Sequence, residues 1–287
     1  MKIEFTKYHG AGNDYIAIDG RELDLDWGLL SKEMSEPHFG VYSDGIVVVQ
    51  ESSVADIRMR VLNPDGSEAE MSGNGVRLFS KFVLDNKIVE LSSSADYLKV
   101  ETGGGVRKVY PHFKSHLMVS AKVAMGEPGF LRDEIPISRE LIGDNIEVQD
   151  FKLNLDDEIT VSCVNIGNPH AVMITDIDID EIDLERIGPL VENNNLFPNR
   201  VNFEVVNIIS RDEIRARIFE RGAGETLSSG TGTSACVIIC IKKGLVNEKV
   251  KVNVPGGFLN ISWIDGKEVY LDGPTEKVFS GTWEIRS

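Results

Sequence analysis

Short apolar or alternating runs recur along the chain, and each is bounded by Gly, Asn, Asp or Pro. Runs of this length with such boundaries are typical of β-strands. They predict strands at residues 46–50, 57–62, 201–209 and 213–219. Two segments have helical periodicity and follow a Gly-rich turn: Gly75 to Asp85, and Gly232 to Lys243, which Gly244 ends. The pattern therefore predicts a chain built mainly of strands, with few and central helices.

Two signatures occur twice in the same order, which indicates an internal repeat. The Gly-Asn pair ending at Asn13 recurs ending at Asn168, 155 positions later, and the Ser-Gly pair beginning at Ser72 recurs at Ser229, 157 positions later. The near-equal spacing favours a duplicated α/β unit whose halves face each other. Residues 126–155, which begin Gly-Glu-Pro-Gly and continue as charged, loop-like sequence, contain the best candidate for the crossing between the halves.

Composition narrows the classes of protein that fit this pattern. The 287 residues include 30 basic and 46 acidic side chains, so the net charge of −16 argues against nucleic-acid binding, which needs Lys and Arg to neutralise phosphates. The most apolar run, Ala235 to Ile241, is far shorter than the ~20 residues that span a bilayer, and the first residues do not resemble a secretory signal. Three scattered cysteines form no disulfide framework. We expect a soluble cytoplasmic protein without membrane partners.

The repeated Ser-Gly motifs carry the first candidate chemistry. Each immediately precedes a helical pattern, so Gly73-Asn74 and Gly230-Thr231 would expose unpaired amides at a helix N-terminus, where the helix dipole favours an anion. Alternatively, Ser72 and Ser229 are only N-caps and the glycines only form turns. Because the motif occurs twice at the repeat spacing, a ligand shared by the halves is the better interpretation.

A second group of candidates consists of polar residues beside glycine or proline or in apolar strands. They are Asn13, Asn63, Asn168, Asn202, Glu220 and Arg221. Asn63 lies in an Asn-Pro-Asp-Gly turn sequence and could serve only the local backbone. Glu220 and Arg221 could form an exposed ion pair, or could present a carboxylate and a guanidinium to a ligand. The set suits a small zwitterion with ammonium and carboxylate groups.

Other site chemistries are poorly supported. His112 and His116 have the spacing of helical metal ligands, but Pro111 and the alternating pattern around them argue against a helix, and no metal site is expected. Neither repeated serine lies in a Gly-x-Ser-x-Gly motif. The glycines near the N-terminus lack the spacing of a dinucleotide fingerprint, and no Walker lysine follows a Gly loop.

Together these motifs resemble the diaminopimelate epimerase family, from residue 5 to about residue 260 and in the family's order. The matching segments are His9-Gly10-Ala11-Gly12-Asn13-Asp14, Asn63-Pro64-Asp65-Gly66-Ser67, Ser72-Gly73-Asn74-Gly75-Val76-Arg77, Gly167-Asn168-Pro169-His170, Arg200-Val201-Asn202 and Glu220 to Gly232. The resemblance implies an α/β (α+β) fold of two pseudo-symmetric domains, each a mainly antiparallel sheet wrapped around a central helix. We expect one half at residues 1–125, joined by the segment 270–287, and the other at 126–269, with the active site in the cleft between them.

The resemblance also implies a reaction and roles for the candidates. The family interconverts LL- and meso-2,6-diaminopimelate on the route to lysine and peptidoglycan, without pyridoxal phosphate, metal or another cofactor, and is homodimeric. Two opposed cysteines move the α-proton. By motif position, His170 and Glu220 would flank this catalytic pair, and Gly73, Asn74, Gly230 and Thr231 would hold the reacting carboxylate. The rest of the substrate would contact Asn13, Asn63, Asn168, Asn202, Glu220 and Arg221.

The sequence departs from the family at both acid–base positions, which are Ser72 and Ser229. A thiol, with a pKa of about 8.5, can be made a thiolate by a helix N-terminus, whereas an alcohol is a far weaker acid. We therefore expect an epimerase form with little activity but an intact ligand site. The serines are either an engineered Cys→Ser pair or a natural divergence, and the survival of every neighbouring motif favours the first. The alternatives are a non-catalytic amino-acid-binding homologue and a racemase of another amino acid.

Overall fold

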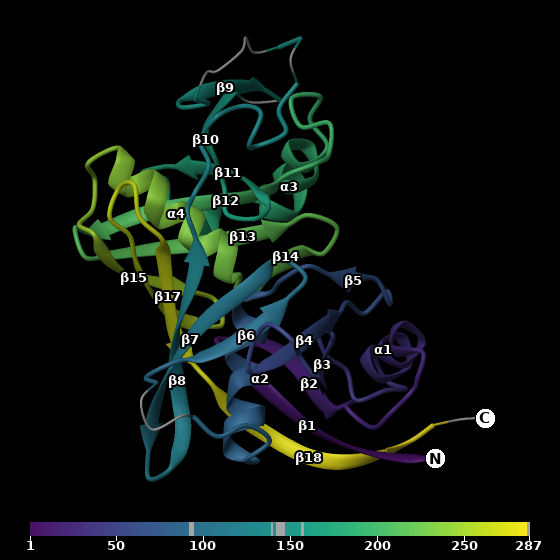
Figure 1. Ribbon diagram of the computed structural model, residues 1–287. Coiled ribbons are helices and arrows are strands. Elements are labelled where there is room, and N and C mark those ends of the chain that lie inside the picture. The colour runs from purple at the N-terminus through teal and green to yellow at the C-terminus, as the bar shows by residue number, and fades with distance from the viewer. Residues whose placement is uncertain (92–94, 139, 142–146, 156–157, 286–287) are drawn as a thin grey trace. The chain divides into compact units, whose positions relative to one another are not determined.

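The computed structural model describes residues 1–91, 95–138, 140–141, 147–155 and 158–285 (Figure 1). The chain divides into two compact units. The first contains residues 1–124 and 272–287, and the second contains residues 125–271. The chain leaves the first unit near the end of β8 (Leu117–Gly126) and returns within β17 (Val269–Pro274). Part of the sequence-predicted crossing, residues 139 and 142–146, lies outside the described residues.

The first unit is a sheet with two helices. Its strands pair in the order β18-β1-β2-β3-β4-β6-β7-β8, with β5 also on β4. The pairs β2–β3 and β4–β6 are parallel and the others are antiparallel. Besides β8, the elements are β1 (Lys2–Gly10), β2 (Asn13–Asp19), α1 (Trp27–Ser35), β3 (Ile46–Gln50), β4 (Ile57–Leu62), β5 (Glu68–Ala69), α2 (Gly73–Asp85), β6 (Leu98–Thr102), β7 (Gly105–Lys114) and β18 (Glu276–Glu284).

The second unit repeats this arrangement. Its strands pair in the order β9-β10-β11-β12-β13-β15-β16, with β14 also on β13, and the parallel pairs are β11–β12 and β13–β15. Besides β17, the elements are β9 (Phe151–Asn154), β10 (Glu158–Asn165), β11 (Pro169–Ile174), the 3₁₀ turn η1 (Ile179–Glu181), α3 (Leu184–Glu192), β12 (Asn202–Ser210), β13 (Glu213–Glu220), β14 (Gly224–Thr226), α4 (Gly230–Lys242), β15 (Lys249–Val254) and β16 (Gly257–Ser262).

The two long helices, α2 and α4, are the central elements of their units. Each has 13 residues, and α4 begins 157 positions after α2, which is the spacing of the Ser-Gly repeat. Helix α2 packs against β1, β2, β3, β4, β6 and β7, and α4 packs against β10, β11, β12, β13, β15 and β16 (Figure 1). Eleven consecutive residues of α2, Gly73 to Val83, are buried, because strands surround the helix rather than cover one face of it.

Strand β3 shows why the sheet of the first unit is apolar on both faces. Ile46 and Val48 belong to a core cluster with the α1 residues Trp27, Leu30 and Met34. The alternate residues of β3, Val47 and Val49, are equally inaccessible to solvent, and α2 packs against the same strand. A strand covered by helices on both faces reads as a continuous apolar run. The predicted fold class is thus confirmed as a mixed α/β fold dominated by sheet.

The sequence pattern missed two helices and displaced two helix starts. Helices α1 and α3 have nine residues each, and α3 contains Pro189, so neither gives a long periodic signal. Asp26 and Asp183 cap them. The expectation of few and central helices therefore applies to α2 and α4 alone. These two begin at their first glycine, two residues earlier than predicted, because the preceding serine is the N-cap.

Candidate functional site

In the first unit, Ser72 is the N-cap of α2 and is partly exposed. Its backbone is extended, with φ −136° and ψ 121°, and its Oγ accepts a hydrogen bond of 2.9 Å from the amide of Gly75. The phenol of Tyr15, on β2, donates to the same Oγ at 3.2 Å. Ser72 Oγ therefore accepts from one side-chain donor and one backbone donor. The amides of Gly73 and Asn74 follow in the first helical turn, where no intrahelical acceptor exists.

The two other candidates of this unit are engaged with nearby side chains. Asn13, at the start of β2, donates from Nδ2 to Asp44 Oδ2 at 2.6 Å. Asn63 donates from Nδ2 to Ser67 Oγ at 2.9 Å, and its carbonyl accepts from the amide of Gly66. Asn63 therefore stabilises the local turn, which is the alternative role that its turn sequence allowed.

In the second unit, Ser229 caps α4 in nearly the same conformation, with φ −129° and ψ 130°. The amide of Gly232 donates to Ser229 Oγ at 3.3 Å, a longer bond than its counterpart on α2. The hydroxyl of Thr231 lies 3.5 Å from Ser229 Oγ. Ser229 is only 4% exposed. The repeat thus places both serines at helix N-termini, but Ser229 is more enclosed.

His170 lies next to this N-terminus in a continuous line of polar contacts. Its Nε2 is 2.9 Å from Asn168 Oδ1, and Asn168 Nδ2 donates to Thr231 Oγ1 at 3.4 Å. On the other side of the ring, Nδ1 is 2.6 Å from Glu204 Oε1. The structure thus joins three sequence-predicted candidates, and it adds Glu204, which sequence reasoning missed. The available signal was one carboxylate within the apolar run that follows Asn202.

The remaining candidates gather where β12 begins and β13 ends. Asn202 is buried and donates to the carbonyl of Pro169 at 2.8 Å, and its Oδ1 accepts from the backbone amide of Arg221 at 3.0 Å. The Arg221 guanidinium donates to the carbonyl of Asn199. Glu220 accepts from the hydroxyl of Thr226 at 2.7 Å. The buried carboxamide of Asn202 therefore fixes the backbone that carries Glu220 and Arg221.

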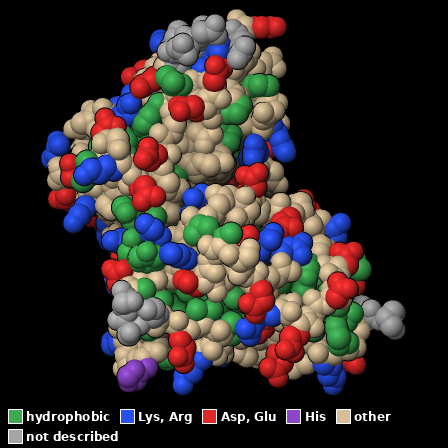
Figure 2. All heavy atoms as spheres, in the orientation of Figure 1, with side chains coloured by type: hydrophobic (Ala, Val, Ile, Leu, Met, Phe, Trp, Pro, Cys, Tyr) green, Lys and Arg blue, Asp and Glu red, His purple; other side chains and the backbone are tan. Residues whose placement is uncertain are grey.

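Two histidines with metal-ligand spacing in the sequence lie outside this set. His112 lies on β7 and His116 in the turn that follows, and no group of three or more His, Cys, Asp or Glu side chains suited to a metal ion occurs among the described residues. Within the same part of the chain, no helix is long and apolar enough to cross a membrane. On the face drawn in Figure 2, acidic and basic side chains are interspersed.

The three cysteines are all buried. Burial raises the pKa of the Cys163 and Cys236 thiols well above the usual range, and raises that of Cys240 to about 12. None of the three lies at a position of the repeated Ser-Gly motif.

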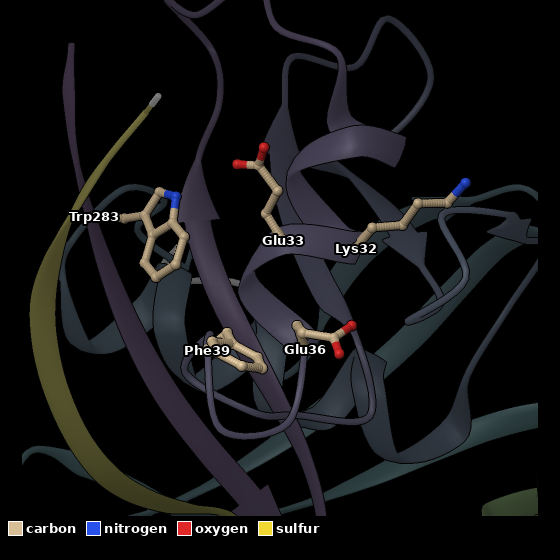
Figure 3. Close-up of a pocket in the computed structure, with 5 residues that line it drawn as sticks. All are labelled: Lys32, Glu33, Glu36, Phe39 and Trp283. Atoms are coloured by element: carbon tan, nitrogen blue, oxygen red, sulfur yellow. The ribbon is translucent and has the colours of Figure 1, made fainter. Parts of the chain in front are cut away.

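A pocket of about 280 Å³ lies elsewhere in the first unit. Figure 3 shows the ring of Trp283, from β18, on one side and side chains from α1 and the segment after it on the other. Its lining residues are Lys32, Glu33, Glu36, Phe39 and Trp283. None of them is a sequence-predicted site residue, so this pocket and the motif residues are separate features.

Known proteins resemble this chain in both sequence and architecture. The family model of diaminopimelate epimerase matches residues 5–131 and 162–278. The diaminopimelate epimerase of Methanococcus maripaludis is 40% identical over 99% of this chain and 100% of its own length, and that of Desulfovibrio desulfuricans is 41% identical over 99% of each chain. The solved structure of a hydroxyproline epimerase from Agrobacterium vitis, with bound trans-4-hydroxy-L-proline, superposes with a TM-score of 0.70 at 14% identity, covering 98% of this chain and 91% of that one.

The chain thus has the fold of that hydroxyproline epimerase. The sequence identity of 40% and 41% to the two epimerases, each over 99% of this chain, shows the family as well. The chain belongs to the diaminopimelate epimerase family.

Proposed function

We propose that this chain binds diaminopimelate and is a serine form of the epimerase, with little activity of its own. The observation that carries the proposal is the identity and setting of residues 72 and 229. Each is a serine that caps one of the two repeated helices, directly before amides that can hold a carboxylate. The ligand contacts are otherwise those that the family motifs imply.

The chemical argument concerns proton transfer at the α-carbon. An α-proton of an amino acid is very weakly acidic, and without a cofactor as electron sink the base must be strong at neutral pH. A cysteine at a helix N-terminus can supply a thiolate, but a serine hydroxyl does not ionise there. We therefore assign Ser72 and Ser229 to the acid–base positions and expect them to perform the step poorly. His170 and Glu220 would flank them in the catalytic set.

The substrate contacts are proposed at the motif positions of each unit. In the first unit, Gly73 and Asn74 would hold the reacting carboxylate, and Asn13 and Asn63 would contact the substrate. In the second, Gly230 and Thr231 would complete the carboxylate cradle. Asn168, Asn202, Glu220 and Arg221 would hold polar groups of the substrate. No cofactor, metal or nucleic acid takes part in this proposal.

The test restores both thiols. In deuterated water with LL-diaminopimelate, S72C/S229C should exchange the α-proton about 10²–10⁴-fold faster than the parent chain, the range that a well-placed acid or base contributes. The matched control is S72A/S229A, which removes both hydroxyls without adding a thiol and should show no gain. Absence of exchange in the folded double-cysteine protein would contradict the proposal.

A non-catalytic amino-acid binder is the second candidate, and the serine at both positions favours it. This candidate differs from the first in one outcome. The parent chain would bind diaminopimelate, but S72C/S229C would show no gain in α-proton exchange. Calorimetric titration with diaminopimelate, proline, histidine and lysine separates these cases from a racemase of another amino acid, which would prefer one of the others. The family also supports a cytoplasmic homodimer in lysine and peptidoglycan precursor synthesis, and light scattering tests the dimer.

A further inference from the structure

A buried hydrogen-bond partner of His170, Glu204, lies outside the motifs that define the family resemblance. His170 and Glu204 are both completely inaccessible to solvent, and His170 Nδ1 lies 2.6 Å from Glu204 Oε1. They come from neighbouring parallel strands, β11 and β12, on which His170 is in register with Asn202, two residues before Glu204. A charged group buried in this way is retained only when it is paired and hydrogen-bonded.

The contacts of the imidazole ring give the line of hydrogen bonds a direction. Nε2 faces the carbonyl oxygen of Asn168, which can only accept, so Nε2 carries a hydrogen. With Oδ1 engaged, the amide nitrogen of Asn168 points to the hydroxyl of Thr231. The ring therefore sets which end of the Asn168 carboxamide faces the N-terminus of α4.

The residues around Glu204 leave space for its carboxyl group beside the imidazole of His170. Its Oε1 lies 3.0 Å from the place where a Cβ at position 232 would be, so the absence of a side chain at Gly232 leaves room for it beneath α4. Its Oε2 has no hydrogen-bond partner within the described part of the chain. Burial raises the pKa of Glu204, as does the like charge of Glu220, whereas His170 lowers it. Nδ1 of the ring thus faces a carboxyl oxygen, and Nε2 faces the amide oxygen of Asn168, to which it donates.

We propose that Glu204 is a positioning residue: by occupying Nδ1 of His170, it fixes the Nε2–H form of the ring and hence the orientation of the Asn168 carboxamide beside Thr231. This inference rests on the proposed function insofar as Asn168 and Thr231 contact the ligand. Glu204 itself touches no substrate. Its contribution is to hold in one orientation the Asn168 carboxamide, which donates to Thr231 of the carboxylate cradle.

The first test reads the ring directly. In the parent chain labelled with ¹⁵N-histidine, and with the His170 signals assigned by their loss in H170N, long-range ¹H–¹⁵N spectra should show a protonated Nε2. In E204Q, the new amide can donate to Nδ1, so Nε2 should stay protonated. In E204L, Nδ1 loses its partner, so the Asn168 carboxamide is free to turn over and the Nδ1–H form should appear beside the Nε2–H form. E213Q, the same change at a partly exposed glutamate of β13 that is remote in the sequence from His170, is the control and should leave the spectrum unchanged.

The second test separates positioning from a purely structural role. In the S72C/S229C background, E204L should raise KM for diaminopimelate about tenfold with kcat nearly unchanged, because a misoriented amide weakens ground state and transition state alike. E204Q should keep KM within about twofold of that of S72C/S229C, because it preserves the Nε2–H form of His170. Thermal unfolding accompanies each variant so that a fold defect is recognised.

The outcomes are separable from those of the proposed function. If the double-cysteine protein neither binds nor exchanges diaminopimelate, the proposed function fails, but the His170 spectra still decide the role of Glu204. An unprotonated Nε2 in the parent chain overturns the inference, even if E204L does not fold. So does a folded E204L whose His170 spectrum and KM match those of its background.

Discussion

At the scale of single residues, the two repeated serines share a backbone conformation but not an environment. Ser72 is partly exposed and its Oγ accepts from Tyr15 and Gly75, whereas Ser229 is almost fully buried against Thr231 and Gly232. The fold therefore makes the two positions chemically unequal, even though the duplication makes them equivalent in sequence. Thiols introduced at the two positions should report this difference.

We expect the three native cysteines to be unreactive and new thiols to differ in rate. At pH 8 without denaturant, the parent chain should give no reaction with Ellman's reagent, because all three thiols are buried and their pKa values are raised. S72C should add one reactive thiol. The new thiol of S229C should react more slowly than that of S72C, by a factor of about ten or more. Denaturation, which should release all three native thiols, is the control. Equal rates at the two new positions would contradict the difference in environment.

At the scale of secondary-structure elements, close packing of α3 on β13 depends on one small residue. A Cβ at Gly188 would lie 2.4–2.8 Å from three ring carbons of Phe219, a core residue of β13. Contacts this short require the ring or the helix to move. The helix therefore needs glycine at 188 although glycine is a poor helix former.

We expect Gly188→Ala to lower the free energy of unfolding by about 1–3 kcal/mol, because overpacking a core costs more than the ~1 kcal/mol that alanine gains in a helix. Urea unfolding measures the change. The matched control is Gly104→Ala, where the nearest heavy atoms lie 3.5 Å away and only a small effect should appear. Equal unfolding midpoints for the parent and Gly188→Ala would show that α3 is free to shift.

The elements also show how far the sequence could be interpreted. Helices α2 and α4 were predicted because each follows a Ser-Gly turn and has helical periodicity, and the repeat identified the two serines that cap them. Helix α3 was missed because it has only nine residues and contains a proline, so its pattern is too short to indicate a helix. Glu204 was missed for a different reason. Its partner lies 34 positions away, and only the parallel register of β11 and β12 brings the two together. Contacts of this kind depend on strand pairing, which composition and local pattern do not specify.

At the scale of the whole molecule, the acidic balance is a property that no single contact explains. The chain has 46 acidic and 30 basic side chains, and its ion pairs include solvent-exposed ones such as Lys152–Glu158 and partly exposed ones such as Arg215–Asp180. Exposed pairs contribute about 0–1 kcal/mol each, whereas the excess of negative charge repels itself throughout the folded state. The net electrostatic effect on stability should therefore be unfavourable at low ionic strength.

Screening should consequently stabilise this protein. Raising sodium chloride from about 20 mM to about 500 mM shortens the range of charge interactions from roughly 20 Å to roughly 4 Å, which weakens long-range repulsion more than contacts between adjacent charges. We expect the midpoint of thermal unfolding to rise by about 2–4 °C, corresponding to about 1 kcal/mol for a chain of this size. The matched control is a variant in which exposed acidic residues such as Glu185 and Asp265 are changed to lysine, since a smaller net charge should give a smaller rise. A fall in the midpoint with salt would mean that exposed ion pairs outweigh the net charge, and would reverse this ranking of the two effects.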